Sequence, residues 1–256
     1  MPEPLLMRYM QPLLAGRRSE CFSVVNNAAR TGIPAEELIC DVILPAMAQV
    51  DRLYRDDRIN IATEHMACRI NRTLADQLQV YLPEQSRIGK RAIIACAAGE
   101  QEELGAEVVG DLLQADGWDI FFLGGGVPID EILSLVGQLR PDVLLIFGTQ
   151  PEGVPETRRL VELIRDVGVC PTMNIVVSGG IYNRADGLWQ EVGADLYSES
   201  VRELRSILYD LPPREPNTPR QGLVKKRRRR RKQNGPAATT PTVEQQEQPT
   251  EALATV

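Results

Sequence analysis

Residues 91–105 read RAIIACAAGEQEELG, which is a short apolar run followed by a glycine-containing turn and the start of a helical pattern. Apolar runs of this length, bounded by turn residues and followed by helices, are typical of strands that are buried on both faces of a parallel sheet. The pattern recurs at 120–123, 143–147 and 175–178, with a weaker run at 195–197. The sequence therefore predicts an α/β domain with a five-stranded parallel sheet.

Five consecutive strand and helix units favour the flavodoxin-like, doubly wound strand order. In that topology ligands bind outside the carboxyl ends of the first and third strands, where the strand order reverses. The loops that follow these strands are residues 97–105 and 147–153. We therefore expect a ligand site to include these two loops.

The N-terminal third has helical periodicity only. Apolar residues recur every three or four positions over 13–29, 35–54 and 61–81, and breaks fall at 32–34 and 56–60. Such segments bury one face each against their neighbours, so they predict a small antiparallel bundle. In the third helix the predicted apolar stripe consists of Met66, Ile70, Leu74 and Leu78.

The third helix carries His65, the only histidine in the chain, next to Glu64. Asn60 is the expected N-cap, which places both residues near the first turn, on the flank of the apolar stripe. The positive end of the helix dipole favours an ionised Glu64 and a neutral imidazole at His65, the form that binds metals. By itself His65 has two interpretations, a packed or surface residue or a ligand, and any role that needs two histidines is excluded.

The composition indicates a protein that folds around its own core, because 43% of 256 residues are hydrophobic and 25% are charged. No apolar run approaches the roughly 18 residues that a membrane-spanning helix needs, and the N-terminus lacks the basic region of a signal peptide. We therefore expect a cytoplasmic protein. Its five cysteines lie far apart without a Cys-x-x-Cys pair, so they predict free thiols and neither disulfides nor a zinc site.

The charge is divided unevenly along the chain. From Pro213 onward there are 10 Lys and Arg but 4 Glu, which leaves a body near −12 and a tail near +6. The tail contains an unbroken basic octet, Lys225 to Lys232, followed by a segment with almost no apolar residues. Such a segment is expected to be disordered and is able to bind nucleic acid or another polyanion. The alternative is a solvated tail, or one that folds back loosely on the acidic body.

Short motifs in both parts together resemble a known family. In the helical part they are Leu13-Leu14-Ala15-Gly16, Leu44-Pro45-Ala46-Met47 with Val50, and Glu64-His65 with Leu74. In the α/β part they are Gly99-Glu100-x-Glu102-x-x-Gly105, Leu123-Gly124-x-x-Val127-Pro128, Pro141-Asp142, Thr149-x-Pro151, Gly179-Gly180 and Gly193-Ala194-Asp195. Their order and spacing over residues of about 5 to 209 resemble the cobalamin (B12)-binding domains of the methionine synthase type and of B12-dependent light-responsive regulators.

The resemblance implies three segments. These are a helical cobalamin-binding cap at residues 1–84, a Rossmann-like cobalamin-binding domain at 88–212, and the basic tail at 213–256. It also implies that cobalamin lies with its corrin ring between the first two, while its nucleotide tail enters a slot in the Rossmann-like domain.

The resemblance assigns roles to residues on both sides of the corrin. In the slot, Gly105, Gly179 and Gly180 would let backbone approach the nucleotide tail, and Thr149 would donate a hydrogen bond to it. For each glycine alone, an ordinary turn residue is the alternative.

On the cap side, Glu64 and His65 would cover the upper face of the corrin, together with Tyr54 at a position where tryptophan is usual. Tyrosine keeps the aromatic plane and adds a hydroxyl group that needs a partner or water.

Two departures from the family pattern concern the lower face of the corrin. Glu102 stands where the family has its cobalt-binding histidine, and a carboxylate oxygen is a poor match for a cobalt that prefers nitrogen. A carboxylate buried there would also need a partner that neutralises it. The second departure is Phe147, where a small serine is usual, because a phenyl group could fill part of the slot.

Three functions remain open at this point. The first is a cobalamin-binding sensor or regulator, not an enzyme, that holds a corrinoid without the lower histidine, with the cofactor either base-on or weakly ligated. The second is a corrinoid protein that carries methyl groups for a separate methyltransferase, although that chemistry normally relies on a lower histidine tuned by its carboxylate partner. The third is a degenerate member that no longer binds cobalamin and acts as an interaction module. The oligomeric state and any protein partner stay undetermined by the sequence.

Overall fold

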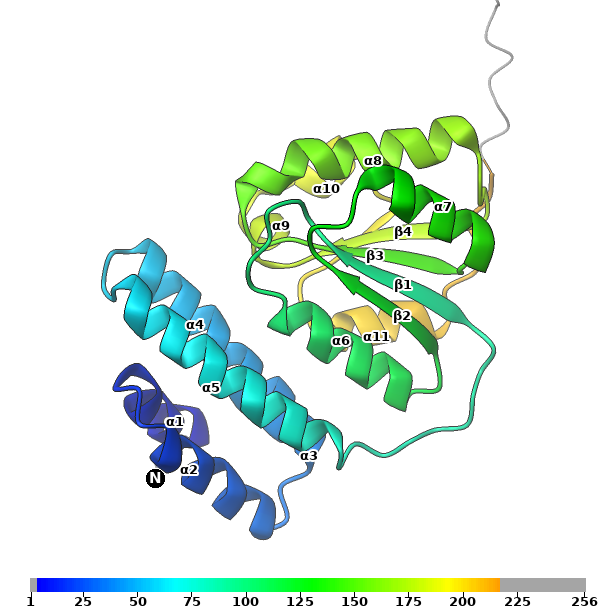
Figure 1. The fold of residues 1–256 in the computed structure, drawn as a ribbon. Coiled ribbons are helices and arrows are strands. Elements are labelled where there is room, and N and C mark those ends of the chain that lie inside the picture. The colour runs from blue at the N-terminus through cyan, green and yellow to red at the C-terminus, as the bar shows by residue number, and fades with distance from the viewer. Residues whose placement is uncertain (1–3, 217–256) are drawn as a thin grey trace, which may run out of the picture. The chain divides into compact units, whose positions relative to one another are not determined.

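The computed structural model of the chain describes residues 4–216, in which helices precede a five-stranded sheet (Figure 1). The helical part consists of α1 (Leu5–Leu14), α2 (Arg18–Arg30), α3 (Ala35–Leu38), the π-helical turn η1 (Ile39–Ile43), α4 (Leu44–Arg55) and α5 (Ile61–Gln79). The basic octet of the predicted tail lies outside the described residues. Among the residues described, no helix is both long and apolar enough to cross a membrane.

The first predicted helix, over residues 13–29, is confirmed only from Arg18 onward. The chain instead forms two helices, and Gly16, at a φ of +66°, lies in the break between them. A residue with a side chain rarely adopts this left-handed conformation, so Gly16 ends the helical path where periodicity alone extended it. Leu13, which is fully buried, belongs to the end of α1 and not to the start of α2.

The second predicted helix, over residues 35–54, is confirmed as one helical run that contains a π-helical turn. Pro45 lies in the first turn of α4, directly after this turn. Proline has no N–H to donate and its ring crowds the carbonyl four residues earlier, so the backbone before it takes the wider π spacing. The predicted break at residues 56–60 is also confirmed.

The third predicted helix is confirmed as α5, and it ends at Gln79, two residues before the predicted end. Asn60 is its N-cap, because its side-chain oxygen accepts the Thr63 N–H at 2.9 Å. Ile70, Leu74 and Leu78 are buried as expected. The prediction that Met66 belongs to the buried stripe is wrong, because this residue is 45% exposed.

The sheet is confirmed as parallel, with the flavodoxin-like order β2-β1-β3-β4-β5. Its strands are β1 (Arg91–Cys96), β2 (Asp119–Gly124), β3 (Val143–Phe147), β4 (Asn174–Ser178) and β5 (Leu196–Ser198). The register pairs Cys96 with Phe147 and Phe147 with Ser178. The last residues of β1, β3 and β4 therefore lie side by side at one edge of the sheet.

Helices cover both faces of the sheet (Figure 1). On one face lie α6 (Leu104–Ala115) and α11 (Val201–Tyr209), and on the other lie α7 (Ile129–Leu139) and α8 (Val154–Val167). The short η2 (Pro151–Gly153), α9 (Gly180–Arg184) and α10 (Leu188–Glu191) complete the sheet part. The β1 side chains alternate between the two cores, with Ile93 in one and Ile94 in the other.

The helical part and the sheet part share a hydrophobic core. Leu74 and Leu78 of α5 belong to the same buried cluster as Leu104, Val108 and Leu112 of α6. Residues 1–216 form one unit, and the boundary predicted between residues 84 and 88 stays a prediction. Four cysteines are buried and Cys40 is partly buried, and all five are free thiols, as expected.

Arg205 of α11 connects three segments at this junction. Its guanidinium pairs with Asp116, just after α6, at 2.6 Å, and also with Glu36 of α3. The side chain is 22% exposed, and these hydrogen bonds to carboxylates raise its pKa. The neighbouring pair of Arg202 with Asp41, at 2.8 Å, is more than half exposed.

Replacing Arg205 with Met is expected to lower the free energy of unfolding by about 1 to 3 kcal/mol, because Glu36 and Asp116 would keep their charge without a partner. Urea unfolding followed by circular dichroism measures the loss. Arg202→Met is the matched control on the same helix, and water screening should make its loss clearly smaller. Equal losses in the two variants would show that the three-segment pairing has no special weight.

Candidate functional site

The two loops predicted to form the ligand site are held together by one carboxylate. Glu100, in the loop after β1, is 9% exposed, and it accepts hydrogen bonds from the N–H of Thr149 at 2.6 Å and from its hydroxyl group at 2.7 Å. The N–H of Glu102 also donates to Glu100, at 3.2 Å. The Thr149 hydroxyl hydrogen is therefore already committed to a partner within the protein.

Glu102 lies in the loop after β1, just before the start of α6. This is the position at which the resemblance expects the cobalt-binding histidine. The Glu102 Oε1 accepts the Leu104 N–H at 2.9 Å. Arg72 of α5 approaches Glu102 at 3.9 Å and pairs with Glu107 at 3.1 Å. The predicted need for a counter-charge is met by this arginine, and the Glu102 side chain remains 28% exposed.

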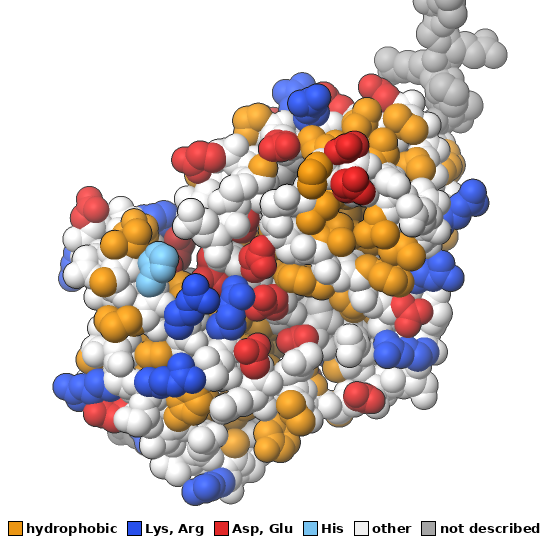
Figure 2. Space-filling model, in the orientation of Figure 1, with side chains coloured by type: hydrophobic (Ala, Val, Ile, Leu, Met, Phe, Trp, Pro, Cys, Tyr) orange, Lys and Arg blue, Asp and Glu red, His pale blue; other side chains and the backbone are white. Residues whose placement is uncertain are grey.

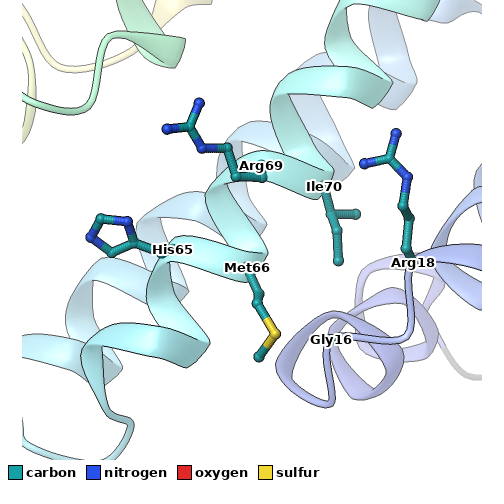
Figure 3. Close-up of a pocket in the computed structure, with 6 residues that line it drawn as sticks. All are labelled: Gly16, Arg18, His65, Met66, Arg69 and Ile70. Atoms are coloured by element: carbon teal, nitrogen blue, oxygen red, sulfur yellow. The ribbon is translucent and has the colours of Figure 1, made fainter.

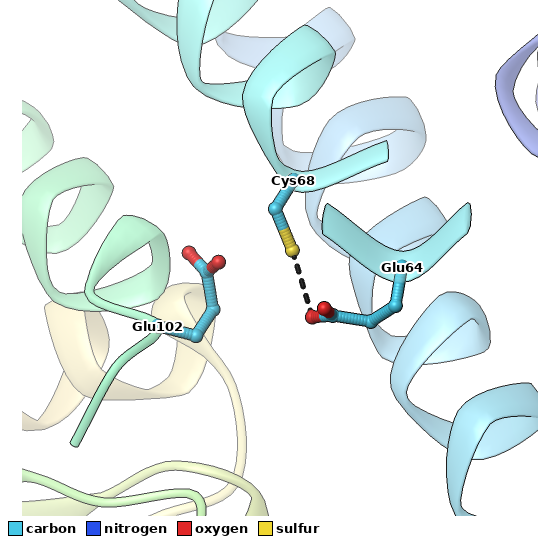
Figure 4. A group of neighbouring side chains, drawn as sticks. All are labelled: Glu64, Cys68 and Glu102. Atoms are coloured by element: carbon cyan, nitrogen blue, oxygen red, sulfur yellow. Dashed lines mark hydrogen bonds between the residues drawn. The ribbon is translucent and has the colours of Figure 1, made fainter. Parts of the chain in front are cut away.

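Glu64, Cys68 and Glu102 form a small cluster between α5 and the loop before α6 (Figure 4). Their potential ligand atoms all lie within 4.8 Å of one another, and the Cys68 Sγ is 3.0 Å from Glu64 Oε1. Burial and the two carboxylates raise the pKa of the Cys68 thiol. Cys68 is therefore a neutral thiol that donates to Glu64.

His65 does not join this cluster. Its side chain is 57% exposed, and its Nε2 lies 3.7 Å from a Glu64 oxygen. In Figure 2 the histidine is visible at the molecular surface. Figure 3 shows it at a shallow hollow on the surface, where the imidazole and the Met66 side chain leave α5 in different directions. The hollow is lined by Gly16, Arg18, His65, Met66, Arg69 and Ile70. The structure thus brings Glu64 to Glu102 and leaves His65 open to solvent.

Tyr54 lies in the last turn of α4 and is 39% exposed. It is absent from both the cluster of Glu64 and the hollow of His65. The three predicted cap residues therefore occupy three different surroundings in this structure.

Two of the predicted glycines, Gly179 and Gly180, differ in how strongly their surroundings require them. Gly179 has a φ of +108°, and a Cβ there would lie 2.3 Å from the carbonyl oxygen of Gly148. At Gly180 a Cβ would lie 2.6 Å from the guanidinium of Arg184, which is a flexible group. Only Gly179 is strictly required by the backbone, so its presence has a structural reason besides any ligand.

Gly105 and Phe147 face each other between α6 and β3. A Cβ at Gly105 would lie 2.5 Å from Cζ of Phe147, so the ring rests directly on the glycine. Phe147 also packs against the buried cluster that contains Cys96, Ala106 and Val109. The resemblance expects the slot for the nucleotide tail beside Gly105, and the phenyl ring occupies this space between α6 and β3.

Three polar residues at this site were absent from the prediction. Two of them, Cys68 and Arg72, follow Glu64 at four-residue intervals. Helical spacing alone therefore places Glu64, Cys68 and Arg72 on one face of α5. A search for polar periodicity would have found them. Arg184 carries no such signal; it donates to the carbonyl oxygen of Thr149 and lies 3.6 Å from Asp51 of α4.

Cobalamin, the cofactor that the resemblance implies, fits only part of this site. A corrin has polar amide edges that Glu64, Cys68, Arg72 and Arg184 are able to hydrogen-bond. On the side of the sheet, however, the slot is filled by Phe147, and Glu102 offers cobalt oxygen instead of nitrogen. The residues suit a corrin ring, and they do not suit an inserted lower base with a protein ligand below cobalt.

The distance between the cluster residues is also too short for a bound ring. Two atoms in contact with opposite faces of a flat ring lie about 7 Å apart, because each van der Waals contact takes about 3.5 Å. The ligand atoms of Cys68 and Glu102 lie within 4.8 Å. A ring therefore enters between them only if the helical part moves away from the loop.

Comparisons with known proteins agree with this fold. A family model described as a B12 binding domain matches residues 90–204, and a second model with the same description matches residues 5–79. Dimethylamine corrinoid protein 3 of Methanosarcina acetivorans is 23% identical over 203 residues, which cover 78% of this chain and 93% of that protein.

A second relative is a regulator. The HTH-type transcriptional repressor CarA of Myxococcus xanthus is 28% identical over 173 residues, which cover 67% of this chain and 57% of the repressor. Among solved structures, the monomethylamine corrinoid protein of Methanosarcina barkeri matches with a TM-score of 0.72 at 16% identity. The match covers 80% of this chain and 96% of that one, and it shows a shared fold.

Carboxylates gather beside the candidate site, where α5 and α6 face each other. Burial, together with repulsion from Glu107 and Asp76, raises the pKa of Asp111 to about 6. Burial also raises the pKa of Glu107, although Arg72 opposes this effect. Gln79 donates to Asp111 at 2.6 Å and leaves its charge uncompensated.

Replacing Asp111 with Asn is expected to stabilise the protein above pH 6. The folded-state pKa of about 6 lies above the value near 4 of an unfolded chain, so the folded protein keeps a proton that the unfolded chain loses. Stability therefore falls as the pH rises from about 4 to about 6, and the loss persists above that. After allowance for partial exposure, we expect Asp111→Asn to recover about 1 to 2 kcal/mol.

Urea unfolding of the wild type and the variant at several pH values between about 4 and about 8 tests this expectation. Asp186→Asn, at an exposed loop position, is the control, and its difference from the wild type should not vary with pH in this way. If the Asp111→Asn difference is the same at all pH values, Asp111 does not titrate as described.

Proposed function

The chain belongs to the B12-binding domain family, and we propose that it is a regulatory protein that holds cobalamin between its helical part and its sheet part without a lower histidine. Cobalamin supplies a cobalt centre whose upper ligand is exchangeable, which gives a sensor something to detect. The chain's one histidine lies on α5, so no histidine is present for the lower face.

The observation that carries the proposal is the close approach of Glu64 and Cys68 to Glu102, with potential ligand atoms within 4.8 Å of one another. These side chains occupy the space that a corrin ring needs, so the closed arrangement and the corrin-bound arrangement exclude each other. A ligand that binds only one of two arrangements shifts the population towards it. Cobalamin would thereby change the position of the helical part, and such a change is a signal that a partner is able to read.

The protein's own residues have distinct roles in this proposal. Glu64, His65 and Tyr54 would face the upper side of the corrin once the helical part has opened, with Cys68 beside them. Thr149, Gly179 and Gly180 would line the sheet edge that approaches the edge of the corrin. Glu102, held by Leu104 and Arg72, would lie below without serving as a cobalt ligand.

A methyl carrier for a separate methyltransferase is the second candidate. Its support is the dimethylamine corrinoid protein, because the chain aligns with 93% of that relative's length and not with a fragment of it. Against it stands Glu102, since methyl carriage cycles through Co(I) and depends on a tuned lower ligand. Enzymatic methyl transfer from methylcobalamin on this chain to a thiol acceptor would favour the carrier.

The partner of the regulator belongs to the proposal as well. The basic octet Lys225 to Lys232 supplies eight positive charges, which suits binding to nucleic acid or another polyanion. The third possibility, an interaction module that has lost cobalamin, is an outcome of the binding experiment below.

Purified protein mixed with hydroxo-, methyl- or adenosylcobalamin and then desalted is expected to retain about one corrinoid per chain. Hydrogen exchange should rise in residues 61–72 when the corrinoid binds, because the close approach to Glu102 is lost. The control segment is β4, which should not change. A colourless protein with all three corrinoids would reject both cobalamin-dependent functions and leave the interaction module.

Replacing His65 with Ala is expected to shift the absorbance spectrum of bound hydroxocobalamin, because the imidazole is able to replace the upper water ligand. Val80→Ala, just after the end of the same helix and 79% exposed, is the matched control and should leave the spectrum unchanged. Identical spectra for the wild type and both variants would make His65 an ordinary surface residue.

A further inference from the structure

Phe147 occupies a central position at the carboxyl edge of the sheet. It is the last residue of β3 and pairs with Cys96 of β1 on one side and with Ser178 of β4 on the other. Two neighbouring strands therefore fix its backbone, and its side chain projects towards α6. The ring reaches Gly105, where a Cβ would lie 2.5 Å from Cζ and 3.0 Å from Cε2.

The phenyl ring of Phe147 leaves no space for another planar group between α6 and β3. Even a single added carbon at Gly105 would clash with it, so the slot has no room for a two-ring aromatic base. The ring also packs against the apolar cluster of Cys96, Ala106 and Val109, and swinging it out would expose that cluster to water. The filled slot is therefore a stable feature of the sheet part.

A displaced lower base requires an open slot and also a second nitrogen that replaces it on cobalt. Glu102 does not provide this nitrogen. When a corrinoid's own base leaves cobalt, another nitrogen normally takes its place, because low-spin cobalt prefers nitrogen to a carboxylate oxygen. Glu102 is held by the Leu104 N–H and by Arg72, and it provides no nitrogen. Within residues 4–216 the only imidazole is that of His65, on α5.

We propose that this chain takes cobalamin in its base-on form, in which the dimethylbenzimidazole of the nucleotide remains bound to cobalt, and that Phe147 is the residue that determines this specificity. The inference rests on the proposed function and concerns the state of the cofactor at the same site. No bond of the cofactor is made or broken on binding, so the step needs no other reactant. Phe147 acts by exclusion and has no contact with cobalt.

The electron paramagnetic resonance spectrum of the Co(II) form tests the state of the base. The full-length protein is loaded with cobalamin whose dimethylbenzimidazole carries ¹⁵N and is then reduced. A base-on cofactor gives a two-line splitting from the labelled base, whereas a histidine nitrogen gives three lines. The His65→Ala variant is measured in parallel, so that the splitting is not assigned to this imidazole. For the wild type, bound methylcobalamin supplies a second readout, because its base-on form is red and a base-off form without a nitrogen ligand is yellow.

Three further variants separate the effect of the filled slot from the effect of the missing nitrogen ligand. Glu102→His supplies a nitrogen but leaves the slot filled, so its cobalamin should stay base-on. Glu102→His combined with Phe147→Ser supplies the nitrogen and opens the slot, so we expect the ratio of base-off to base-on cofactor to rise at least about tenfold over Glu102→His alone. Phe147→Leu in the same background keeps an apolar side chain and guards against loss of folding, which circular dichroism monitors; it should give an intermediate ratio.

The possible outcomes separate this inference from the function on which it rests. Base-on cobalamin in the wild type and in Glu102→His, with a base-off cofactor in the double variant, is the expected result. A bound but base-off cofactor in the wild type, or in Glu102→His alone, overturns the role of Phe147 while the proposed function stands. Retention of no corrinoid by the wild type overturns both.

Discussion

The carboxylate of Glu100 accepts two hydrogen bonds from Thr149, and the rest of the site depends on this interaction. It ties the loop after β1 to the loop after β3 at the edge where their strands end together. A carboxylate that is 9% exposed is stable only when such donors satisfy it. With both loops held, Glu102 is fixed at the start of α6 and Phe147 is fixed against Gly105. One short segment thus sets the position of both residues that depart from the family pattern.

The interactions between the helical part and the sheet part are strong near α11 and weak near the candidate site. Near α11, Arg205 joins Glu36 to Asp116, and a shared apolar core lies between α5 and α6. Near the candidate site, Arg72 alone faces several carboxylates, and their repulsion contributes to the raised pKa values of Glu107 and Asp111. Excess negative charge favours separation of the two surfaces. The fold is therefore suited to opening near Glu102 while it remains joined near Arg205.

The sheet and the identity of the two site loops were predictable from the sequence, because each depends on local patterns. Apolar runs located all five strands, and the rule for the carboxyl ends of parallel strands located the Glu100 and Thr149 loops. The break at Gly16 was missed, since its apolar neighbours continue a helical period across it. Contacts such as Arg72 with Glu102 depend on how α5 packs on α6, which no local pattern encodes. His65 and Glu64 are adjacent in sequence, yet about 100° of helical rotation directs them to different surroundings.

The two departures from the family pattern gain meaning when they are considered together. If Phe147 alone filled the slot, a histidine below cobalt would displace the base, and the displaced base would then have no place to go. If Glu102 alone replaced the histidine, a base in an open slot would leave cobalt with an oxygen ligand or with none. Each change by itself weakens one cofactor state, whereas both changes together disfavour the same state and leave the base-on state intact. The pair is therefore better explained by a change in how a corrinoid is held than by decay of the site.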